Sequence, residues 1–475
     1  MFNGLQRKAG FAIILALSLL LLAFGTIVPS RAALAASTIT INGSSKHQTI
    51  DGFGFSDAFG PASTLQTSPA SQQKQMLDLL FNTSNGAGFT ILRNLFPSDA
   101  ANTIEPTSPG KPGSTPHYVA LGSSEGQVWL AQQAKNYGVK QFYGDAWSAP
   151  GYMKTNGNES NGGSLCGVPG ATCSSGDWRQ AYANYLAQYI KDYQSAGITL
   201  THVGAFNEPN LVTSYSSMVM NPTQAANLIA VLGPTLKTAK LSPKIVCCDG
   251  EGWNTAQSYA NGITSNATAN SYTSNISSHG YTGAPNSALT GTGSKHIWET
   301  EWATFDTWDP AWDSGSDASG FTWAQNVYNG ITKANLSAFL YWWGVGFNGT
   351  DNGMLIHDNN GTVTASKRLW ALANYSRFIH PGATRIGATS GNSSLEVTAY
   401  TNPDGSVAIV VLNTSSANVT ASFAVSQTSV ANGAAIVPYL TNASHNTAAQ
   451  GTLHLANGAF SATVPGRALV TYTIK

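Results

Sequence analysis

Two glutamates stand out as candidates for chemistry, because each follows a short apolar run that predicts a strand. Glu208 lies in the segment Asn207-Glu208-Pro209 after the run 202–206, and Glu301 ends the run 296–301. Two carboxyl groups that flank a glycosidic bond can cleave it, one as acid/base and the other as nucleophile. Two unrelated acids at the starts of loops would give the same pattern. Position alone therefore leaves both interpretations open.

The neighbours of the two glutamates suggest different roles. Pro209 and Phe206 make the surroundings of Glu208 partly apolar, which favours its protonated form and hence the acid/base role. Asn207 is placed to hydrogen-bond a hydroxyl group of a bound sugar. Glu299 faces the same side of its strand as Glu301. We expect Glu299 to be a hydrogen-bonded structural carboxylate rather than a second acid that tunes Glu301.

Short apolar runs alternate with segments of helical period between residues 50 and 380. This alternation predicts a parallel barrel of βα units, a TIM barrel, in which catalytic groups lie at the carboxyl ends of the strands. Glu208 and Glu301 then belong to the fourth and seventh strands. The sixth unit is the least regular, since the segment before its strand is polar. The eight predicted strands are 50–55, 89–92, 139–145, 202–206, 245–249, 276–281, 296–301 and 338–343, and the clearest predicted helices are 178–196, which Asp177 is placed to cap, 222–239, 321–334 and 367–378.

Segments outside the predicted barrel have different sequence patterns. Basic residues, a long apolar run and small residues predict a signal peptide over 1–35. Alternating strands and turn residues predict an antiparallel β-sandwich over 381–475, which the strand in 36–49 is expected to join. The expected catalytic domain is then 50–380.

Composition favours a secreted, extracellular protein that binds a neutral partner. Charged residues make up 10% of the chain, against about 25% in typical soluble domains. The 23 basic and 23 acidic residues balance, which disfavours nucleic acid and anionic membranes as partners. We expect a monomer that, once the signal peptide is removed, has no membrane segment. No cysteine or histidine cluster has the spacing of a zinc site, and we expect neither a metal nor an organic cofactor.

The four cysteines fall into two pairs. Cys166 and Cys173 flank a short loop, and we expect a disulfide between them in an oxidising compartment. Cys247 and Cys248 are adjacent in sequence, and neighbouring cysteines seldom reach good bridge geometry. We therefore expect Cys247 and Cys248 to be buried free thiols.

Five motifs together resemble those of glycoside hydrolase family 30, over nearly the whole mature chain. Asn-Glu-Pro alone is common among barrel glycosidases, whereas the five in this order are specific. The motifs are Asp51-Gly52-Phe53-Gly54 with Ser56, Trp147-Ser148-Ala149-Pro150 with Met153-Lys154, Asn207-Glu208-Pro209, Thr300-Glu301-Trp302, and the segment from Ser376 to Gly382.

The resemblance implies a TIM barrel with a β-sandwich built from both ends of the chain. It also implies a retaining mechanism through a covalent glycosyl-enzyme, with Glu208 as acid/base and Glu301 as nucleophile. For His279 a core position is the alternative, and of the Trp342-Trp343 pair we expect one ring in the core and one exposed. The substrate-binding residues that the resemblance implies are Asn207, Trp147, His279, Tyr281, Trp342 and Trp343, with Arg93 near the nucleophile.

The segment around Cys166 and Cys173 resembles the xylanase branch of the family that is best known from fungi. A plant cell-wall polysaccharide, β-1,4-xylan or glucuronoxylan, is the substrate that this implies. That branch tends to carry an arginine where this chain has Gly60-Pro61, and the segment 344–361 contains no arginine. We therefore expect no strict dependence on glucuronate. The alternatives are an endo-β-1,6-galactanase or β-1,6-glucanase of the same family, and a non-catalytic carbohydrate-binding protein.

Overall fold

The computed structural model describes residues 37–475. The predicted signal peptide at 1–35 lies outside the described residues. No helix within residues 37–475 is long and apolar enough to cross a membrane.

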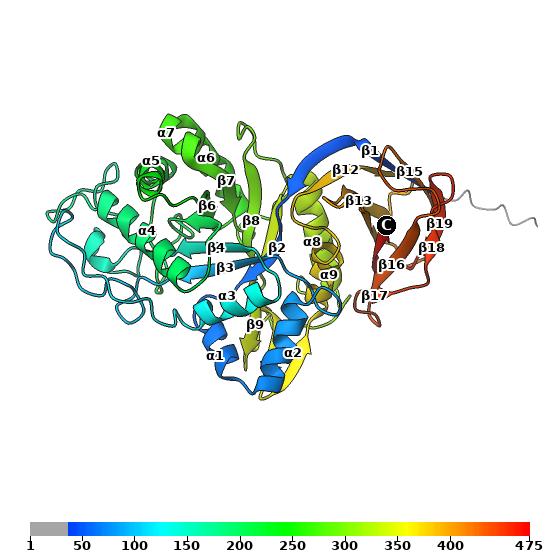
Figure 1. Ribbon diagram of the computed structural model, residues 1–475, viewed down its shortest axis with the longest axis horizontal. Helices are drawn as coiled ribbons and strands as arrows, with labels where there is room; N and C mark the ends of the chain where they lie inside the picture. The colour runs from blue at the N-terminus through cyan, green and yellow to red at the C-terminus, as the bar shows by residue number, and fades with distance from the viewer. Residues whose placement is uncertain (1–36) are drawn as a thin grey trace, which may run out of the picture. The chain divides into compact units, whose positions relative to one another are not determined.

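Eight parallel strands form a closed barrel (Figure 1). The last barrel strand pairs with both the first and the seventh, which closes the sheet. This confirms the predicted TIM barrel. Its strands are β2 (Gly52–Ser56), β3 (Ile91–Phe96), β4 (Gln141–Ala146), β5 (His202–Gly204), β6 (Lys244–Gly250), β7 (Thr273–Ser278), β8 (His296–Trp302) and β9 (Ala338–Phe347).

Helices connect the barrel strands, and each of them buries part of its surface, α8 and α9 partly against strands of the second sheet. In α4 the buried residues Tyr182, Tyr185 and Tyr189 recur at helical spacing. The cap of α4 is Trp178 rather than Asp177, whose Oδ1 instead accepts a hydrogen bond from the Arg179 backbone at 3.1 Å. The helices are α1 (Pro61–Thr67), α2 (Ala70–Phe81), α3 (Gln127–Asn136), α4 (Arg179–Ser195), α5 (Pro222–Thr238), α6 (Trp253–Ser265), α7 (Ala267–Tyr272), α8 (Gly320–Lys333) and α9 (Lys367–Ser376), with a 3₁₀ turn at Gly151–Met153.

The sixth barrel strand begins earlier than its sequence predicts. It is β7, Thr273–Ser278, so that His279 and Tyr281 lie in the loop beyond its carboxyl end. Most of its side chains are buried, although all of them except Ile276 are Ser, Thr or Asn. Small polar side chains inside a barrel give no apolar run, which is why the sequence pattern was weak there.

Strand β1 and the strands after residue 382 form the β-sandwich, in a second hydrogen-bonded sheet. Strand β1 (Ser37–Ile50) lies between β12, to which it is antiparallel, and β15, to which it is parallel (Figure 1). The sandwich therefore does include the N-terminal strand, as predicted, and it is mixed rather than wholly antiparallel. Its other strands are β12 (Ala383–Ser390), β13 (Leu395–Thr401), β14 (Val407–Asn413), β15 (Val419–Ser426), β16 (Ala435–Thr441), β17 (Ala448–Ala449), β18 (Leu453–His454), β19 (Ala459–Val464) and β20 (Ala468–Ile474), while β10 (Met354–Asn359) and β11 (Thr362–Ala365) form a hairpin beside β9.

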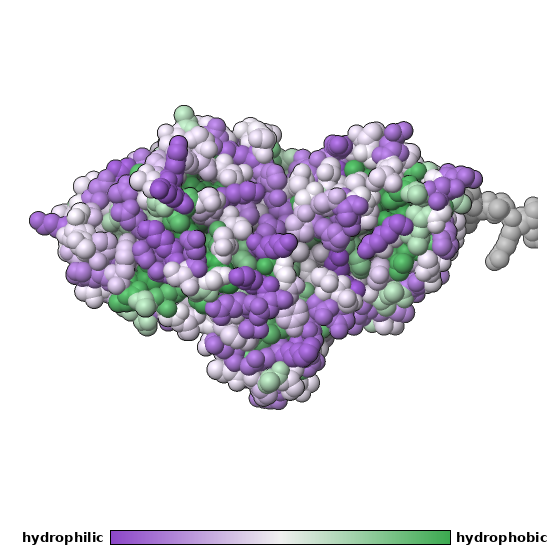
Figure 2. Space-filling model, viewed as in Figure 1, coloured by the Kyte–Doolittle hydropathy of each residue, from purple (hydrophilic) through white to green (hydrophobic). Residues whose placement is uncertain are grey.

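Buried aliphatic side chains make up most of the sandwich core, which also holds three aromatic rings. The ring centroids of Phe423 and Phe460 lie 4.3 Å apart in a stack, and that of Tyr472 lies 4.9 Å from Phe423. On the outside, Figure 2 shows hydrophilic residues over most of one face, with hydrophobic residues in small groups between them. Uncharged polar residues supply much of that surface, because only 10% of the chain is charged.

Both cysteine pairs are joined as disulfides, and the described residues hold no free cysteine. The predicted bridge between Cys166 and Cys173 is confirmed, with a Cα–Cα separation of 5.5 Å. The expectation of free thiols at Cys247 and Cys248 is wrong. The peptide bond between these two residues is cis, and their Cα atoms lie 3.0 Å apart.

Candidate active site

Arg93, on β3, lies at the centre of the carboxyl end of the barrel and is fully buried. Its Nη1 donates to Glu301 Oε2 at 2.5 Å. Its Nη2 donates to Asn207 Oδ1 at 2.5 Å and to Asp145 Oδ2 at 2.7 Å, and lies 3.1 Å from Asp249 Oδ2. Burial alone would lower the pKa of Arg93, but the surrounding carboxylates raise it. The guanidinium therefore stays charged and joins groups from several strands.

Glu301 lies near the end of β8 with donors on both of its carboxyl oxygens. Tyr281 Oη donates to Oε1 at 2.8 Å, and Arg93 donates to Oε2. Burial raises the pKa of Glu301, while His279, Arg93 and the Tyr281 hydroxyl oppose that rise. Two donors that point at the carboxyl group stabilise its ionised form.

Glu208 follows β5 in the left-handed region of backbone conformation, at φ 44°, which is uncommon for a residue other than glycine. Its backbone N–H donates to the carbonyl of Asp249 at 2.8 Å. Its Oε1 lies 3.0 Å from His279 Nδ1. Burial first, and the Glu251 carboxylate second, raise the pKa of Glu208 to about 7. Glu208 is thus suited to hold a proton near neutral pH.

Asp145 and Asp249 form a buried pair beneath Arg93. Burial, and then the charge of Asp249, raise the pKa of Asp145 well above its usual value. Burial acts most strongly on Asp249 too and raises its pKa, but the Arg93 guanidinium, His279 and hydrogen bonds from Ser277 and Asp145 together outweigh burial and lower the pKa to about 2. Tyr143 and Thr300 hydroxyls each donate to Asp249 at 2.7 Å. Asp249 is therefore the ionised member that balances Arg93.

A cavity of about 640 Å³ lies over Glu208 and Glu301. Aromatic rings form most of its wall, and rings of this kind stack on the apolar faces of sugars. No lysine or arginine is among the described residues that line it, and Glu251 is its third acid. The lining residues are Phe59, Trp147, Glu208, Leu211, Tyr215, Glu251, Tyr281, Thr282, Glu301, Phe305, Trp342 and Trp343.

The tryptophans that the sequence singles out lie together in this wall. The Trp147 ring lies 4.4 Å from the Arg93 guanidinium, which places a cation against its face. Trp342 is buried and Trp343 is half-buried rather than exposed, and both line the cavity, with their ring centroids 5.5 Å apart. A register shift between β2 and β9 at this point lets two consecutive side chains face the same space.

The structure brings together the other expected residues beneath the cavity. Asn207 and Arg93 are bonded to each other, and Tyr281 contacts Glu301. His279 is fully buried, with Nδ1 on Glu208 and Nε2 3.9 Å from Glu301 Oε2. Burial lowers the pKa of His279 and so favours its neutral form. His279 is therefore buried, as the alternative of a core position predicted. Its ring nevertheless faces both glutamates.

Sequence reasoning missed several residues around the site. Phe305, which is 58% exposed, stacks on Tyr281 with ring centroids 5.8 Å apart. Phe59 lies 5.7 Å from both Trp147 and Tyr215, measured between ring centroids. These residues lie in loops, where no periodic pattern marks them. Two buried acids, Asp145 and Asp249, ended predicted strands and could have been found by the rule that located the glutamates.

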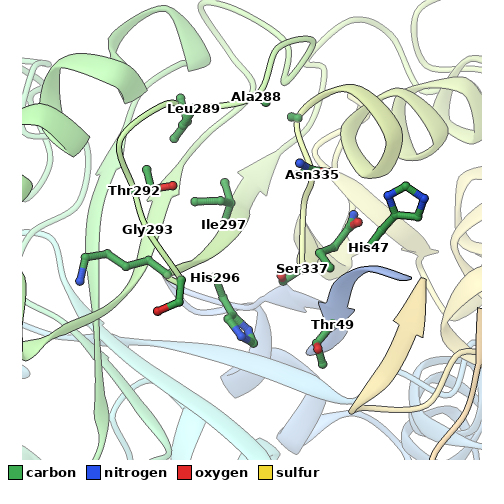
Figure 3. Close-up of a pocket in the computed structure, with 14 residues that line it drawn as sticks. His47, Thr49, Ala288, Leu289, Thr292, Gly293, His296, Ile297, Asn335 and Ser337 are labelled. Atoms are coloured by element: carbon green, nitrogen blue, oxygen red, sulfur yellow. The ribbon is translucent and has the colours of Figure 1, made fainter. Parts of the chain in front are cut away.

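A second cavity, of about 440 Å³, lies at the other end of the barrel (Figure 3). His47, His296 and Ser337 help to line it, near the amino ends of β8 and β9, whereas Glu301 lies near the carboxyl end of β8. His296 Nδ1 is engaged with Asp51 Oδ2 at 2.7 Å. The described residues that line this cavity include no carboxylate pair, so the chemistry belongs to the first cavity.

Glu208, His279 and Glu301 each offer one potential metal ligand, and these three atoms lie within 4.8 Å of one another. Most of the candidate atoms are already engaged: Glu301 accepts from Arg93 and Tyr281, and Glu208 contacts His279 Nδ1. His279 Nε2 is buried without a hydrogen-bond partner. The arrangement suits the holding and transfer of a proton.

Known families match both parts of the chain. A model of O-glycosyl hydrolase family 30 matches residues 120–300, and a model of the glycosyl hydrolase family 30 beta sandwich domain matches residues 382–472. The catalytic domain of GH30 xylanase C from Talaromyces cellulolyticus is 43% identical, with a TM-score of 0.86 over 92% of this chain and 100% of that one. This chain belongs to glycoside hydrolase family 30.

Curated relatives of this family 30 glycoside hydrolase are more distant. An endo-1,6-beta-D-glucanase of Trichoderma harzianum is 28% identical over 77% of this chain and 78% of its own length. A glucuronoxylanase of Bacillus subtilis is 23% identical over 93% of this chain and 92% of its own length. Membership of the family makes the substrate a glycoside, and the relatives differ in the polymers that their names state.

Proposed function

We propose that this chain is a secreted, retaining glycoside hydrolase that cleaves β-1,4-xylan, with Glu208 as acid/base and Glu301 as nucleophile. One observation carries the mechanism: an oxygen of Glu208 and an oxygen of Glu301 lie within 4.8 Å of each other. Retaining enzymes hold their carboxyl groups about 5 to 5.5 Å apart, whereas inverting enzymes need about 6.5 to 9.5 Å to admit a water. The shorter spacing supports double displacement.

The environments of the two glutamates support this division of roles. Glu301, held by Arg93 and Tyr281, attacks the anomeric carbon as a carboxylate. Glu208, whose pKa burial raises to about 7, gives its proton to the leaving oxygen. A water then attacks the glycosyl-enzyme, and Glu208 takes back a proton from it. The anomeric configuration is retained because it is inverted twice.

Asn207 is oriented for a contact with the sugar. Its Oδ1 accepts from Arg93 Nη2 at 2.5 Å, so its Nδ2 is the group left to donate. A donor beside the 2-hydroxyl group strengthens its hydrogen bond in the transition state. Asn207 therefore complements the two glutamates rather than competing with them for a proton.

The xylan assignment draws on the relative with the highest identity of those named above, the xylanase from Talaromyces cellulolyticus at 43%. The cavity supports an uncharged chain, since its described lining holds three acids and no base. The acids in this lining would repel the negative charge of a glucuronate side group, and no arginine lines the cavity to bind it. Glucuronoxylan is then a substrate by virtue of its unsubstituted stretches.

We also propose that residues 1–35 direct secretion, that 50–380 form the catalytic domain, and that 36–49 with 381–475 form the sandwich domain. The disulfide between Cys166 and Cys173 supports an oxidising compartment. Intact mass of protein recovered from the culture medium would test the cleavage site.

Product analysis on purified polymers tests the substrate. The enzyme is expected to release oligosaccharides from unsubstituted xylan and from glucuronoxylan, while Glu301→Ala releases none from either. Products from glucuronoxylan alone would contradict the proposed indifference to glucuronate. Absence of sugar release from every polymer would favour a carbohydrate-binding protein.

The second candidate is hydrolysis of β-1,6-glucan, which the 28% identical endo-1,6-beta-D-glucanase favours. β-1,6-Galactan belongs in the same screen. Turnover of either polymer with no turnover of xylan would replace the proposed substrate and leave the mechanism unchanged.

A further inference from the structure

The nucleophile candidate lies in a break in the barrel sheet. Strand β8 pairs with β9 at Glu299, opposite Phe339, and again at Trp302, opposite Tyr341. Two residues of β8, Thr300 and Glu301, therefore lie opposite the single residue Leu340. That is the arrangement of a β-bulge, which leaves ladder groups unpaired and redirects side chains.

The bulge explains how two consecutive side chains reach one buried cluster. Side chains alternate along a regular strand, so Thr300 and Glu301 should face opposite sides. Instead Thr300 Oγ1 donates to Asp249 at 2.7 Å, and Glu301 accepts from Arg93, which itself contacts Asp249.

The side chain of Glu299 occupies the break. Its Oε1 accepts from the backbone N–H of Glu301 at 2.8 Å, and its Oε2 accepts from the backbone N–H of Leu340 at 3.3 Å. These donors belong to the residues on the two sides of the bulge. Glu299 is completely buried, so water does not compete for them.

We propose that Glu299 is a positioning residue: its carboxyl group takes the place of the missing ladder acceptors and so fixes the backbone that carries Glu301. We assign it no contact with the substrate, since it is completely buried, both of its carboxyl oxygens accept from backbone N–H groups, and the described lining of the cavity does not include it. This inference rests on the proposed role of Glu301 as nucleophile. It adds that a second residue, Glu299, places that nucleophile.

Glu299→Gln is the most direct variant. It keeps the size of the side chain but presents an amide N–H₂ to one of the two N–H donors, so one hydrogen bond is lost. A displaced nucleophile slows the chemical step more than substrate binding. We expect kcat to fall about 10-fold for Glu299→Gln and about 100-fold for Glu299→Ala, with KM unchanged within about twofold.

Asp51→Asn is the matched control. Asp51 Oδ2 accepts from Trp298 Nε1 and from His296 Nδ1, both at 2.7 Å, at the amino end of the same strand β8. This variant weakens both hydrogen bonds to β8, because a neutral amide oxygen replaces the carboxylate oxygen as their acceptor, so we expect a lower Tm with kcat within about twofold of wild type. Measuring Tm, kcat and KM for all three variants separates positioning from stability.

The comparison uses whichever polymer the wild-type enzyme degrades. Failure on xylan would therefore contradict the proposed substrate without affecting the comparison of variants. The positioning role would be overturned by a Glu299→Gln kcat no lower than that of Asp51→Asn, by a loss confined to KM, or by a Glu299→Gln protein that fails to fold, which would assign Glu299 to stability. A wild type that degrades no polymer would contradict both the role and the proposed function.

Discussion

Glu208 and Glu301 carry the same functional group, and their neighbours make them different. Glu301 accepts from a guanidinium and a phenol hydroxyl, whereas Glu208 contacts a histidine whose pKa is lowered by burial. Donors to a carboxylate stabilise its ionised form, while burial and a neighbouring negative charge favour the carboxylic acid. The asymmetry between acid and nucleophile therefore comes from Arg93 and Tyr281 at Glu301, and from burial and the Glu251 carboxylate at Glu208.

Replacing Glu208 by Gln should stabilise the protein at alkaline pH. The pKa of Glu208 rises from 4.5 to about 7 on folding, so the folded state resists its ionisation. That cost is absent below about pH 4.5, where both states hold the proton, and is fully present above about pH 7. We expect Glu208→Gln to gain up to about 3 kcal/mol over wild type near pH 8 and almost nothing near pH 4. Urea unfolding at the two pH values measures this, and a gain equal at both would refute it.

Replacing Glu251 by Gln should move the alkaline limit of activity. After burial, the Glu251 charge is the next cause that raises the pKa of Glu208. Removing that charge lowers the pKa of Glu208, so Glu208 loses its proton at lower pH. The alkaline limb of the kcat/KM profile therefore shifts to lower pH. Asp78→Asn, which removes a carboxylate that pairs with Lys74 far from the cavity, should leave the limb in place. If the alkaline limb of kcat/KM stayed at the same pH in Glu251→Gln, the Glu251 charge would have no effect on the pKa of Glu208.

The elements of the barrel follow from sequence more readily than the details of the site. Alternating apolar runs and helices predicted the eight strands, and the strand-end rule located both glutamates. The bulges could not be predicted, because a bulge adds one residue to a strand without changing its composition. One bulge brings Glu301 and Thr300 to the same cluster, and another lets Trp342 and Trp343 face one cavity.

Loop residues show the same limit. Phe305 and Tyr215 line the cavity from loops whose path depends on tertiary contacts. The pairing of Cys247 with Cys248 was missed for a related reason, since the sequence does not show how two adjacent side chains are oriented. Local periodicity therefore predicts elements, and non-local packing decides which side chains meet.

The disulfide in the loop between β4 and α4 offers a test at the scale of one element. Cys166 and Cys173 close a loop whose ends are seven residues apart in sequence. Closing a loop this short restricts the unfolded chain, and we expect Cys166→Ser with Cys173→Ser to cost about 2 kcal/mol of unfolding free energy. Chemical denaturation of the double variant beside wild type measures the cost. Equal stability would mean that the loop is held by its other contacts.

The barrel and the sandwich are tied by buried contacts within residues 37–475. Thr471 Oγ1, on β20, donates to the backbone carbonyl of Asn374 on α9 at 2.6 Å, and Asn374 Nδ2 donates to Thr441 Oγ1 at 2.5 Å. Strand β1 extends from its sandwich pairing with β15 to Ile50, immediately before the barrel. The two parts should therefore unfold together.

Calorimetry of Asn374→Ala tests this coupling. The variant leaves Thr441 and Thr471 with fewer partners, which should cost about 1 to 3 kcal/mol. We expect one transition in wild type and one transition at lower Tm in the variant. Two separated transitions in the wild type would show that barrel and sandwich unfold independently.

The stereochemistry of the first-formed product tests the central claim most directly. A β-linked chain cleaved by double displacement first yields the β-anomer at the new reducing end, which mutarotation then converts to the equilibrium mixture. Proton NMR during the first minutes of hydrolysis distinguishes the two anomers. The proximity of Glu208 and Glu301 predicts the β-anomer first, and an initial α-anomer would contradict the assignment of Glu301 as nucleophile.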